Sequence, residues 1–264
     1  MLIAIFSDVH GNLTALEAVL ADIKAQAPDL VAFAGDLCLF GPRPAACLER
    51  VRQEAITAVY GNKDEIIFNP TPVSYQVQSV IQEKREKSGH IVAWTQAQLS
   101  AGQLAWLRTL PFHRRVSPTP HPKDDLFIVH ANPKDVQRHI YPPEARQQEI
   151  YGEVKQPDSD NDLNHMLRDL SCDLLAFGHV HVPNIRHWHN KTLVNISSVS
   201  LPQDGDKRAK YGLLKWDKHS GWRIQHRYIT YDVDEEIALL QERQPPGWES
   251  YQRQLETARP RRSI

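Results

Sequence analysis

Short apolar runs alternate with helical periodicity at the start of this chain, and this alternation restricts the fold more than any other feature. The runs are Leu2 to Phe6, Leu30 to Ala34 and Ile56 to Tyr60. Between them, apolar residues recur at helical spacing, and Pro28 and Pro42 mark breaks in the connections. Strands that alternate with helices over such distances favour a parallel sheet with helices on its faces.

A helical insertion is predicted at about residues 70–110, where the chain is more polar. Val77, Val80 and Ile81 would share one side of a first helix. Ser100 would begin a second helix, because a glutamine three residues later completes a capping box.

The second half of the chain is predicted to be rich in strands. The expected strands are Phe112 to Val116, Leu126 to Val129, Cys172 to Phe177, Asn184 to Trp188, Thr192 to Ile196, Tyr211 to Trp216 and Trp222 to Thr230. Residues 132–162 show little periodicity, so they are predicted to be a long loop that covers part of a functional site. A helix is expected from Asp162 to Leu170, and two helices and a basic tail over residues 233–264. We treat residues 1–264 as a single domain, since α/β domains of this size are common.

Composition argues against several classes of partner. The formal net charge is -1 and the pI is about 6.9, which does not indicate a nucleic acid or an anionic membrane. The three cysteines are widely separated, so neither a disulfide framework nor a thiolate zinc site is expected. Asp8 interrupts the first apolar run before it could serve as a signal peptide, and no later segment is long enough to cross a membrane. We therefore expect a cytoplasmic protein, whose oligomeric state the sequence leaves open.

Side chains that can bind a cation follow five of the apolar runs. They are Asp8, His10, Asp36, Asn62, His130, His179 and His181. One such residue after a strand is more often a cap or turn residue than a metal ligand. In open α/β sheets, however, ligand sites form at the carboxyl ends of the strands, where all of these side chains would meet. Their agreement predicts a metal site built from nitrogen and oxygen ligands.

These motifs resemble those of the calcineurin-like metallophosphoesterases. The matching segments, in order, are Asp8-Val9-His10, Gly35-Asp36, Gly61-Asn62, His130 and Gly178-His179-Val180-His181. The resemblance covers residues 1 to about 216 and is greatest for the small bacterial and archaeal phosphodiesterase branch. It implies a four-layer α/β/β/α sandwich, in which two mixed β-sheets are flanked by helices.

The resemblance also implies a dinuclear centre with two divalent metal ions. Manganese is the metal we favour, and iron, zinc or nickel would suit the same ligands. One ion would be held by Asp8, His10 and His181, the other by Asn62, His130 and His179, with Asp36 bridging the two. A metal-bridging hydroxide would then attack the phosphorus of a small phosphoester, with nucleotide-derived compounds among the candidate substrates.

Three residues, Lys63, Asp64 and Asn12, leave the chemistry open. Many family members have a histidine directly after the Gly-Asn pair, where this chain has Lys63 followed by Asp64. Lysine is a poor proton donor near neutral pH, since its ordinary pKa is about 10.4. We name Lys63 and Asp64 as candidate catalytic residues, with a purely electrostatic role for Lys63 as the alternative. Asn12 is a candidate substrate-binding residue that could equally begin the first helix.

Phosphodiester hydrolysis is the predicted activity. A phosphomonoesterase, or a protein or nucleotide phosphatase, on the same site is the nearest alternative. A metal-binding scaffold with weakened catalysis is an alternative of a different class, motivated by Lys63.

Overall fold

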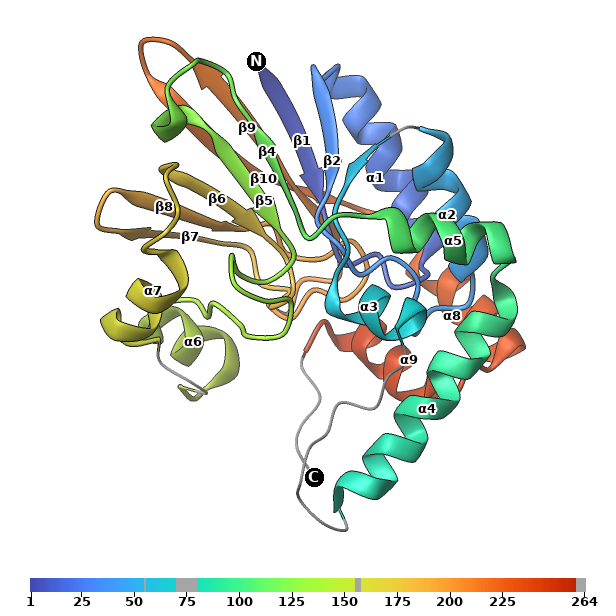
Figure 1. Cartoon of the computed structure of the whole chain (residues 1–264). Coiled ribbons are helices and arrows are strands. Elements are labelled where there is room, and N and C mark those ends of the chain that lie inside the picture. Colours follow the sequence, from blue (N-terminus) through green and yellow to red (C-terminus); the bar gives the residue numbers. More distant parts are fainter. Residues whose placement is uncertain (55, 70–79, 155–157, 260–264) are drawn as a thin grey trace.

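Two five-stranded sheets face each other at the centre of the fold in the computed structural model, which describes residues 1–54, 56–69, 80–154 and 158–259. Helices lie on the outer side of each sheet (Figure 1). The arrangement is therefore the four-layer α/β/β/α sandwich that the motif resemblance implied.

The first sheet has the strand order β10-β9-β1-β2-β3. Its strands are β1 (Leu2–Phe6), β2 (Leu30–Phe33), β3 (Thr57–Ala58), β9 (Ala209–Asp217) and β10 (Gly221–Ile229). The strands β1, β2 and β3 run parallel, as predicted, and β9 pairs antiparallel with β1. The third predicted strand, Ile56 to Tyr60, is only two residues long, because the chain soon enters the helix α3 (Asn62–Phe68). This helix was not predicted from the sequence.

The second sheet has the order β4-β5-β6-β8-β7. Its strands are β4 (His113–Val116), β5 (Leu126–Val129), β6 (Leu174–Phe177), β7 (Asn184–Trp188) and β8 (Lys191–Asn195). The central strands β5, β6 and β8 are parallel, and β4 and β7 pair antiparallel at the edges. The predicted strands of the second half are confirmed to within about two residues at each end, and β8 pairs parallel with β6 and antiparallel with β7.

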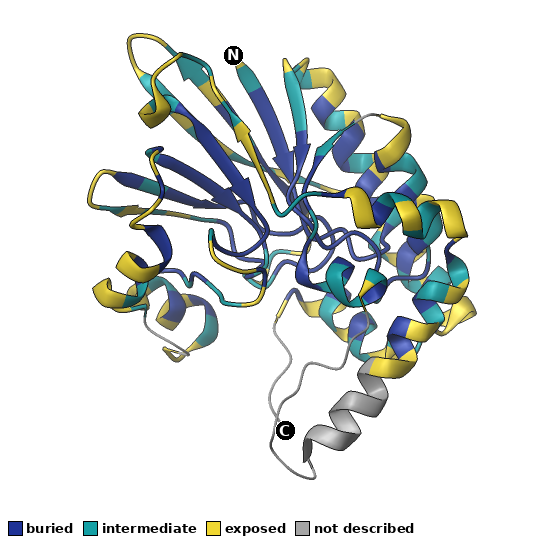
Figure 2. Ribbon diagram, viewed as in Figure 1, coloured by how far each residue is buried: buried dark blue, intermediate teal, exposed yellow. Residues whose placement is uncertain are grey.

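Burial on both faces explains why the central strands β1, β5 and β6 are continuous apolar runs. In β1, Ile3 and Ile5 pack between the two sheets, and Ala4 and Phe6 pack against the helices. Successive side chains of a strand point to opposite faces, so a strand covered on both faces must be apolar throughout. In Figure 2, β1, β5 and β6 form part of the buried interior, whereas the edge strands β4, β7 and β10 are partly exposed.

Helices cover the outer faces unequally. The larger group lies on the side of the first sheet: α1 (Leu13–Gln26), α2 (Pro44–Gln53), α3, α4 (Val80–Gln98), α5 (Ala101–Thr109), α8 (Val233–Arg243) and α9 (Trp248–Thr257). On the side of the second sheet lie α6 (Glu144–Tyr151) and α7 (Asp160–Leu167), and Leu163, Met166 and Leu167 of α7 pack on that sheet. None of the helices in the described residues is long and apolar enough to span a membrane.

The expectation of a structureless loop over residues 132–162 was wrong in part. It contains α6, which begins after Pro143 and ends at Gly152 in the left-handed conformation. This helix buries only Gln147 and Ile150, so the sequence lacks the apolar stripe by which a surface helix is recognised. The predicted helix from Asp162 to Leu170 begins and ends slightly earlier, as α7. Val77 and the end of the basic tail, residues 260–264, lie outside the described residues, as do the side chains of Val80 and Ile81.

Candidate metal centre

All of the predicted ligand side chains lie together, at the carboxyl ends of the parallel strands. Asp8 and His10 follow β1, Asp36 follows β2, and Asn62 begins α3 after β3. From the second sheet, His130 follows β5, and His179 and His181 follow β6. The two sheets point these ends toward the same place, so residues as far apart in sequence as 8 and 181 are brought into contact.

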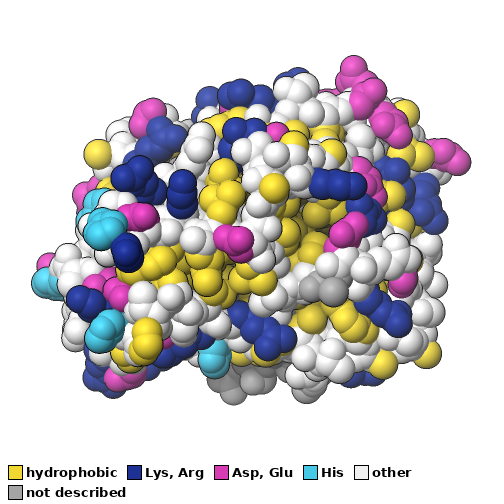
Figure 3. Space-filling view, turned by 90° about the horizontal axis from the view of Figure 1, so that it is seen from above, with side chains coloured by type: hydrophobic (Ala, Val, Ile, Leu, Met, Phe, Trp, Pro, Cys, Tyr) yellow, Lys and Arg dark blue, Asp and Glu magenta, His cyan; other side chains and the backbone are white. Residues whose placement is uncertain are grey.

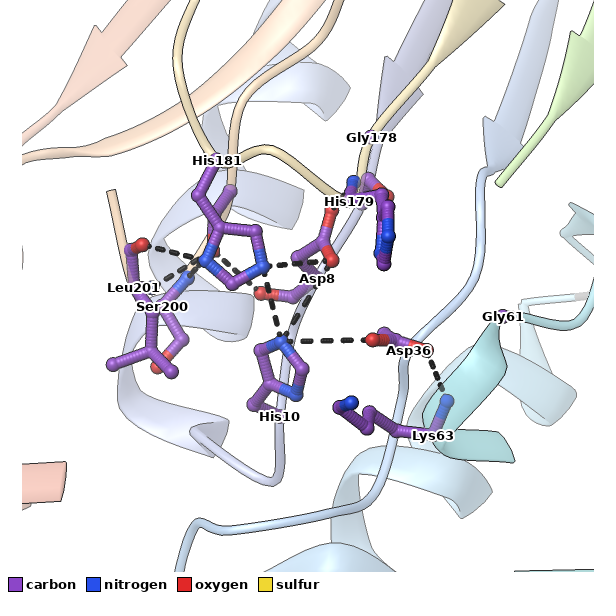
Figure 4. A network of polar contacts seen from close by, with 12 residues as sticks. Asp8, His10, Asp36, Gly61, Lys63, Gly178, His179, His181, Ser200 and Leu201 are labelled. Atoms are coloured by element: carbon purple, nitrogen blue, oxygen red, sulfur yellow. Dashed lines mark hydrogen bonds and ion pairs between the residues drawn. The ribbon is translucent and has the colours of Figure 1, made fainter. Parts of the chain in front are cut away.

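Asp8, His10 and His181 form one compact group (Figure 4). The Oδ1 atom of Asp8 lies 3.0 Å from Nε2 of His181 and 3.7 Å from Nε2 of His10. The two Nε2 atoms are 3.3 Å apart. All three side chains are buried.

A second group surrounds Nε2 of His130. This atom lies 3.1 Å from Oδ1 of Asn62, 3.2 Å from Nδ1 of His179 and 3.5 Å from Oδ2 of Asp36. The side chains therefore fall into the two groups that the family resemblance implied, and the Asp36 carboxylate is the one expected between them.

Asp36 occupies the position between the two groups. Its Oδ2 atom is 3.5 Å from Nε2 of His130 and 3.9 Å from Nε2 of His10, so one oxygen faces both groups. Its Oδ1 atom accepts the backbone N–H of Lys63 at 2.7 Å. The helix that follows Asn62 therefore fixes the orientation of the carboxylate that could be shared.

Backbone carbonyls fix the tautomers of three histidines. Nδ1 of His181 lies 2.8 Å from the carbonyl of Leu201, Nδ1 of His130 lies 2.9 Å from that of Ala34, and Nε2 of His179 lies 2.9 Å from that of Gln137. A carbonyl can only accept, so each of these nitrogens carries the hydrogen. In each neutral ring the other nitrogen carries a lone pair, and that lone pair faces the centre.

The centre therefore gathers more acceptors than donors. Imidazole lone pairs, two carboxylates and the amide oxygen of Asn62 face one another at 3.0 to 3.9 Å. Acceptors at this spacing repel one another unless protons or cations lie between them. Nitrogen and oxygen donors of this kind fit divalent transition metals, so the residues present fit the predicted metal ions.

The protonation equilibria of the site reflect the same shortage of positive charge. Burial raises the pKa of Asp36 and lowers that of His10 well below its usual range. Burial alone would also lower the pKa of His181, but the Asp8 carboxylate raises it overall. Divalent cations would offset the free-energy cost of burying ionised carboxylates, and the imidazoles could stay neutral.

Glycines beside the ligands allow the loops to approach one another. A Cβ atom on Gly178 would lie 2.3 Å from Oδ2 of Asp8, and one on Gly61 would lie 2.2 Å from Oδ1 of Asp36. These contacts explain the glycines that stand next to the ligand residues in the sequence motifs.

The backbone is strained at five of the seven ligand positions. Positive φ angles of 49° to 67° occur at Asp8, His10, Asp36, His179 and His181. Positive φ angles are uncommon for residues other than glycine, and a group of them in one place is typical of a functional site.

The three residues predicted for catalysis or substrate binding occupy different environments. In Figure 4, the side chain of Lys63 points toward the space beside His10 and Asp36. Asp64 is fully buried, and its oxygens accept the backbone N–H groups of Asp36, Leu37 and Gly61.

Burial, and then the charge of Asp36, raise the pKa of Asp64 to about 7. Its contacts fit a residue that positions Asp36 rather than one that touches a substrate.

Asn12 is buried and begins α1, which was one of its two predicted roles. Its Oδ1 atom accepts the N–H of Ala15 at 2.9 Å. Its amide nitrogen donates to the hydroxyls of Ser200 and Tyr231 at 3.1 and 3.4 Å. Both polar groups of Asn12 are therefore engaged within the protein.

Several supporting residues were not recognised from the sequence. Ser198 donates to the carbonyl of Asp8 at 2.8 Å, and Tyr251 contacts both Ser200 and the carbonyl of His10. Their roles depend on contacts with distant segments, and no spacing in the sequence indicates them. Gln137 and His139, which lie against His179, belong to the same class.

Comparisons with known proteins agree with this geometry. Residues 1–219 match the family model described as the calcineurin-like phosphoesterase superfamily domain. An uncharacterized protein of Methanocaldococcus jannaschii, MJ0912, is 25% identical over 265 residues, which is 94% of this chain and 95% of that protein.

Two solved structures extend the comparison. A metallophosphoesterase from Sphaerobacter thermophilus is 26% identical, with a TM-score of 0.70 and coverage of 98% of this chain and 99% of that one. Hypothetical protein PH1004 from Pyrococcus horikoshii OT3 is 16% identical, with a TM-score of 0.75 and coverage of 97% and 98%, and so supports the fold alone. The family model spans most of the sequence and includes all of the clustered ligand residues, and we conclude that this chain belongs to the calcineurin-like phosphoesterase superfamily.

Proposed function

We propose that this protein hydrolyses phosphodiesters with two divalent metal ions, one held by Asp8, His10 and His181 and the other by Asn62, His130 and His179, with Asp36 shared. The observation that carries the proposal is the inward direction of the imidazole lone pairs. Three imidazoles donate their N–H groups to backbone carbonyls, so their other nitrogens face the centre. The membership of the metallophosphoesterase superfamily supports a hydrolase.

Bound there, the cations would neutralise charge on phosphoryl oxygens and lower the pKa of a water from about 15.7 toward about 7. Manganese is our first candidate, and iron, zinc or nickel would suit the same donors. The protein itself would orient the centre. The backbone N–H of Lys63 holds Asp36 in place, and the Lys63 ammonium supplies positive charge beside it.

Lys63 also bears on the choice of substrate. Because an ammonium group is a poor proton donor near neutral pH, a leaving group that needs no protonation would react best. We therefore expect aryl diesters to be hydrolysed faster than alkyl diesters, and Lys63→His to reduce this difference. The same ratio of aryl to alkyl rates in both proteins would contradict this role for Lys63.

The substrate we propose is a small phosphoester, including nucleotide-derived diesters. The motif resemblance to the phosphodiesterase branch favours diesters over monoesters. On the face shown in Figure 3, which lies at the start of β1 and away from the candidate centre, Lys and Arg side chains are interspersed with Asp and Glu, so this face presents no continuous basic surface. We also propose a cytoplasmic location, since Cys38, Cys47 and Cys172 are buried and unpaired, as suits a reducing compartment.

The decisive experiment combines metal analysis with a substrate screen. Protein stripped of metal is reloaded with Mn²⁺, Zn²⁺, Ni²⁺ or Fe²⁺, and the bound ions are counted. The same preparation is then assayed with bis-p-nitrophenyl phosphate and p-nitrophenyl phosphate.

We expect two bound ions and faster hydrolysis of the diester. The variant Asp36→Asn should lose at least about 100-fold in rate, because removing one group that organises a metal centre costs several kcal/mol of transition-state stabilisation. The exposed control Asp234→Asn should keep its activity. Faster monoester hydrolysis would favour a phosphatase, and two bound ions without turnover of either compound would favour a scaffold.

A further inference from the structure

One of the two ligand groups is held in place by a segment that belongs to neither sheet. This segment, residues 132–141, is named here the positioning loop. It follows β5 and the ligand His130, and it lies beside His179 and Asn62. The sequence analysis predicted only that residues 132–162 cover part of a functional site.

Gln137 contacts two ligand side chains at once. Its backbone carbonyl accepts the Nε2–H of His179 at 2.9 Å, which leaves Nδ1 of that ring as the lone pair facing His130. Its side-chain Oε1 accepts the amide of Asn62 at 3.2 Å, which turns Oδ1 of Asn62 toward the centre. A single residue therefore sets the tautomer of one ligand and the amide orientation of another.

His139 fixes the plane of the same histidine. Its ring stacks on that of His179, with centroids 4.1 Å apart and planes at 27°. The His139 ring also stacks on that of Tyr141, with centroids 5.0 Å apart and planes at 17°. A hydrogen bond to Nε2 alone would let the His179 ring rock about that bond, and the stack restricts this rocking.

The loop is itself firmly built. The Oδ1 atom of Asn132 accepts the N–H groups of Lys134 and Asp135, and its amide donates to the carbonyl of Arg138 at 2.8 Å. One oxygen of Asp135 accepts the N–H groups of Gln137 and Arg138 at 2.7 and 2.6 Å. Such local side-chain bonds to the backbone hold a loop in one conformation without regular secondary structure.

Ion pairs tie the positioning loop to α7. Lys134 pairs with Asp169, just after that helix, and Arg138 pairs with Asp162 within it. The loop is thus anchored to the outer layer of the second sheet.

The other ligand group is supported differently. Asp8, His10 and His181 are buried, and the backbone of the neighbouring strand ends holds them: the N–H of His10 donates to the carbonyl of Asp36, and the N–H of His179 donates to Oδ2 of Asp8 at 3.0 Å. His181 donates to Leu201 rather than to the positioning loop. Changes in the loop should therefore affect one half of the centre more than the other.

The geometry points to Gln137 and His139 as positioning residues that set the metal affinity of the Asn62, His130 and His179 half. This inference rests on the proposed function, because it requires that the half binds a metal ion. It goes further by predicting that the two ions are bound with unequal dependence on the loop.

The test measures metal binding to the full-length protein by calorimetric titration of Mn²⁺ into metal-free protein, with metal content checked by elemental analysis. Gln137→Met removes the side-chain acceptor at similar size. His139→Ala removes the stack, and His139→Phe restores an aromatic face without ring nitrogens. Gln53→Met and His219→Ala are matched controls at exposed positions far from the site in sequence.

We expect Gln137→Met and His139→Ala each to weaken one of the two ions by about 10- to 100-fold, the usual effect of losing an outer partner of a metal ligand. The other ion should bind as in the unchanged protein, and His139→Phe should recover most of the lost affinity. Thermal unfolding of the metal-free variants verifies that each remains folded.

Three results would overturn the inference: unchanged binding of both ions in Gln137→Met and His139→Ala, equal weakening of both ions, or no recovery with His139→Phe. A separate outcome concerns the proposed function. If the unchanged protein itself fails to bind two ions, the dinuclear centre is wrong, whereas normal binding by the unchanged protein together with silent variants refutes only the role of the positioning loop.

Discussion

Replacing Asp64 tests whether this buried carboxylate positions the centre or takes part in the reaction. Its Oδ2 atom accepts the N–H groups of Asp36 and Gly61 at 2.8 and 2.9 Å, and Oδ1 accepts that of Leu37 at 2.9 Å. Asp64 thereby joins the loop after β2 to the start of α3, the two segments that present Asp36 and Asn62.

The size of the effect follows from which bonds each variant can keep. Asp64→Asn can turn its single oxygen toward the N–H groups of Asp36 and Gly61. Its NH₂ group then faces the N–H of Leu37, and because both groups are donors this N–H is left without an acceptor. One buried N–H left without a partner costs about 1 to 3 kcal/mol, so we expect a loss of about 2 kcal/mol. Asp64→Ala leaves all three N–H groups without an acceptor, so on the same basis it should lower the free energy of unfolding by about 3 to 9 kcal/mol. Since many domains are stable by only about 5 to 15 kcal/mol, the alanine variant could fail to fold.

The assay is urea-induced unfolding of the metal-free protein, followed by tryptophan fluorescence, with metal binding and diester hydrolysis measured on the folded Asp64→Asn variant. The exposed control Asp234→Asn should stay within about 0.5 kcal/mol of the unchanged protein. The reasoning is refuted if Asp64→Asn costs less than about 0.5 kcal/mol, since a buried N–H would then have lost its partner at almost no cost. A variant of full stability and normal metal content that had lost its activity would instead make Asp64 a catalytic residue.

Three further substitutions probe separate features. Gly61→Ala adds a Cβ 2.2 Å from Oδ1 of Asp36 at a φ of -106° that alanine tolerates, so it should displace that carboxylate and weaken metal binding at least about tenfold in the same titration. Leu174→Ala opens a cavity between the sheets and should cost about 2 to 5 kcal/mol in urea unfolding, and a loss below about 1 kcal/mol would contradict the tight packing of this layer. Asp22→Asn removes the negative charge and one of the two oxygens that accept from Tyr211 and Arg227, and it should cost about 1 to 2 kcal/mol of the free energy of unfolding at pH 7. Burial opposes the ionisation of Asp22, but Arg227 and Tyr211 lower its pKa overall, so its contribution is present above the unfolded value of about 3.9 and disappears as the pH falls through the lower folded value. Unfolding curves at pH 7 and pH 3 should therefore show a smaller difference between the two proteins at the lower pH.

Periodicity predicted the elements that bury apolar residues and missed those that do not. The strand β5 was predicted with the right ends, because each of its residues is buried and a polar residue follows it. In contrast, α3 begins at a ligand, and α6 buries little apolar surface, so neither presents a helical stripe. Hydrophobic patterning reports burial, and an element that is shaped by a site or lies at the surface leaves a weak pattern.

The gathering of the candidate ligand residues at one place could be predicted, because the topology combines several weak signals. On its own, Asp36 would be interpreted as a turn residue. Parallel strands, however, bring several strand ends to one edge, and each of these ends carries a side chain that can bind a cation. The supporting residues lack this redundancy. Nothing in the sequence near Gln137 or Tyr251 shows that it contacts His179 or the carbonyl of His10, because both contacts join segments that only the folded chain brings together.

The strained backbone at the ligands connects stability with metal binding. A left-handed conformation costs a residue with a side chain about 1 to 2 kcal/mol, and Asp8, His10 and Asp36 all adopt it. Interlocking hydrogen bonds impose it, since the N–H groups of Asp8 and His10 donate to the carbonyls of Gly35 and Asp36. This arrangement also holds acceptors against one another, so the folded chain is destabilised at the place where a cation would relieve the repulsion. A metal ion at 100 times its dissociation constant adds about 2.7 kcal/mol to the free energy of unfolding if the unfolded chain does not bind it. The metal-free protein should therefore unfold at a lower temperature than the loaded one, and equal unfolding temperatures would mean that the acceptor cluster does not bind the ion in the folded state.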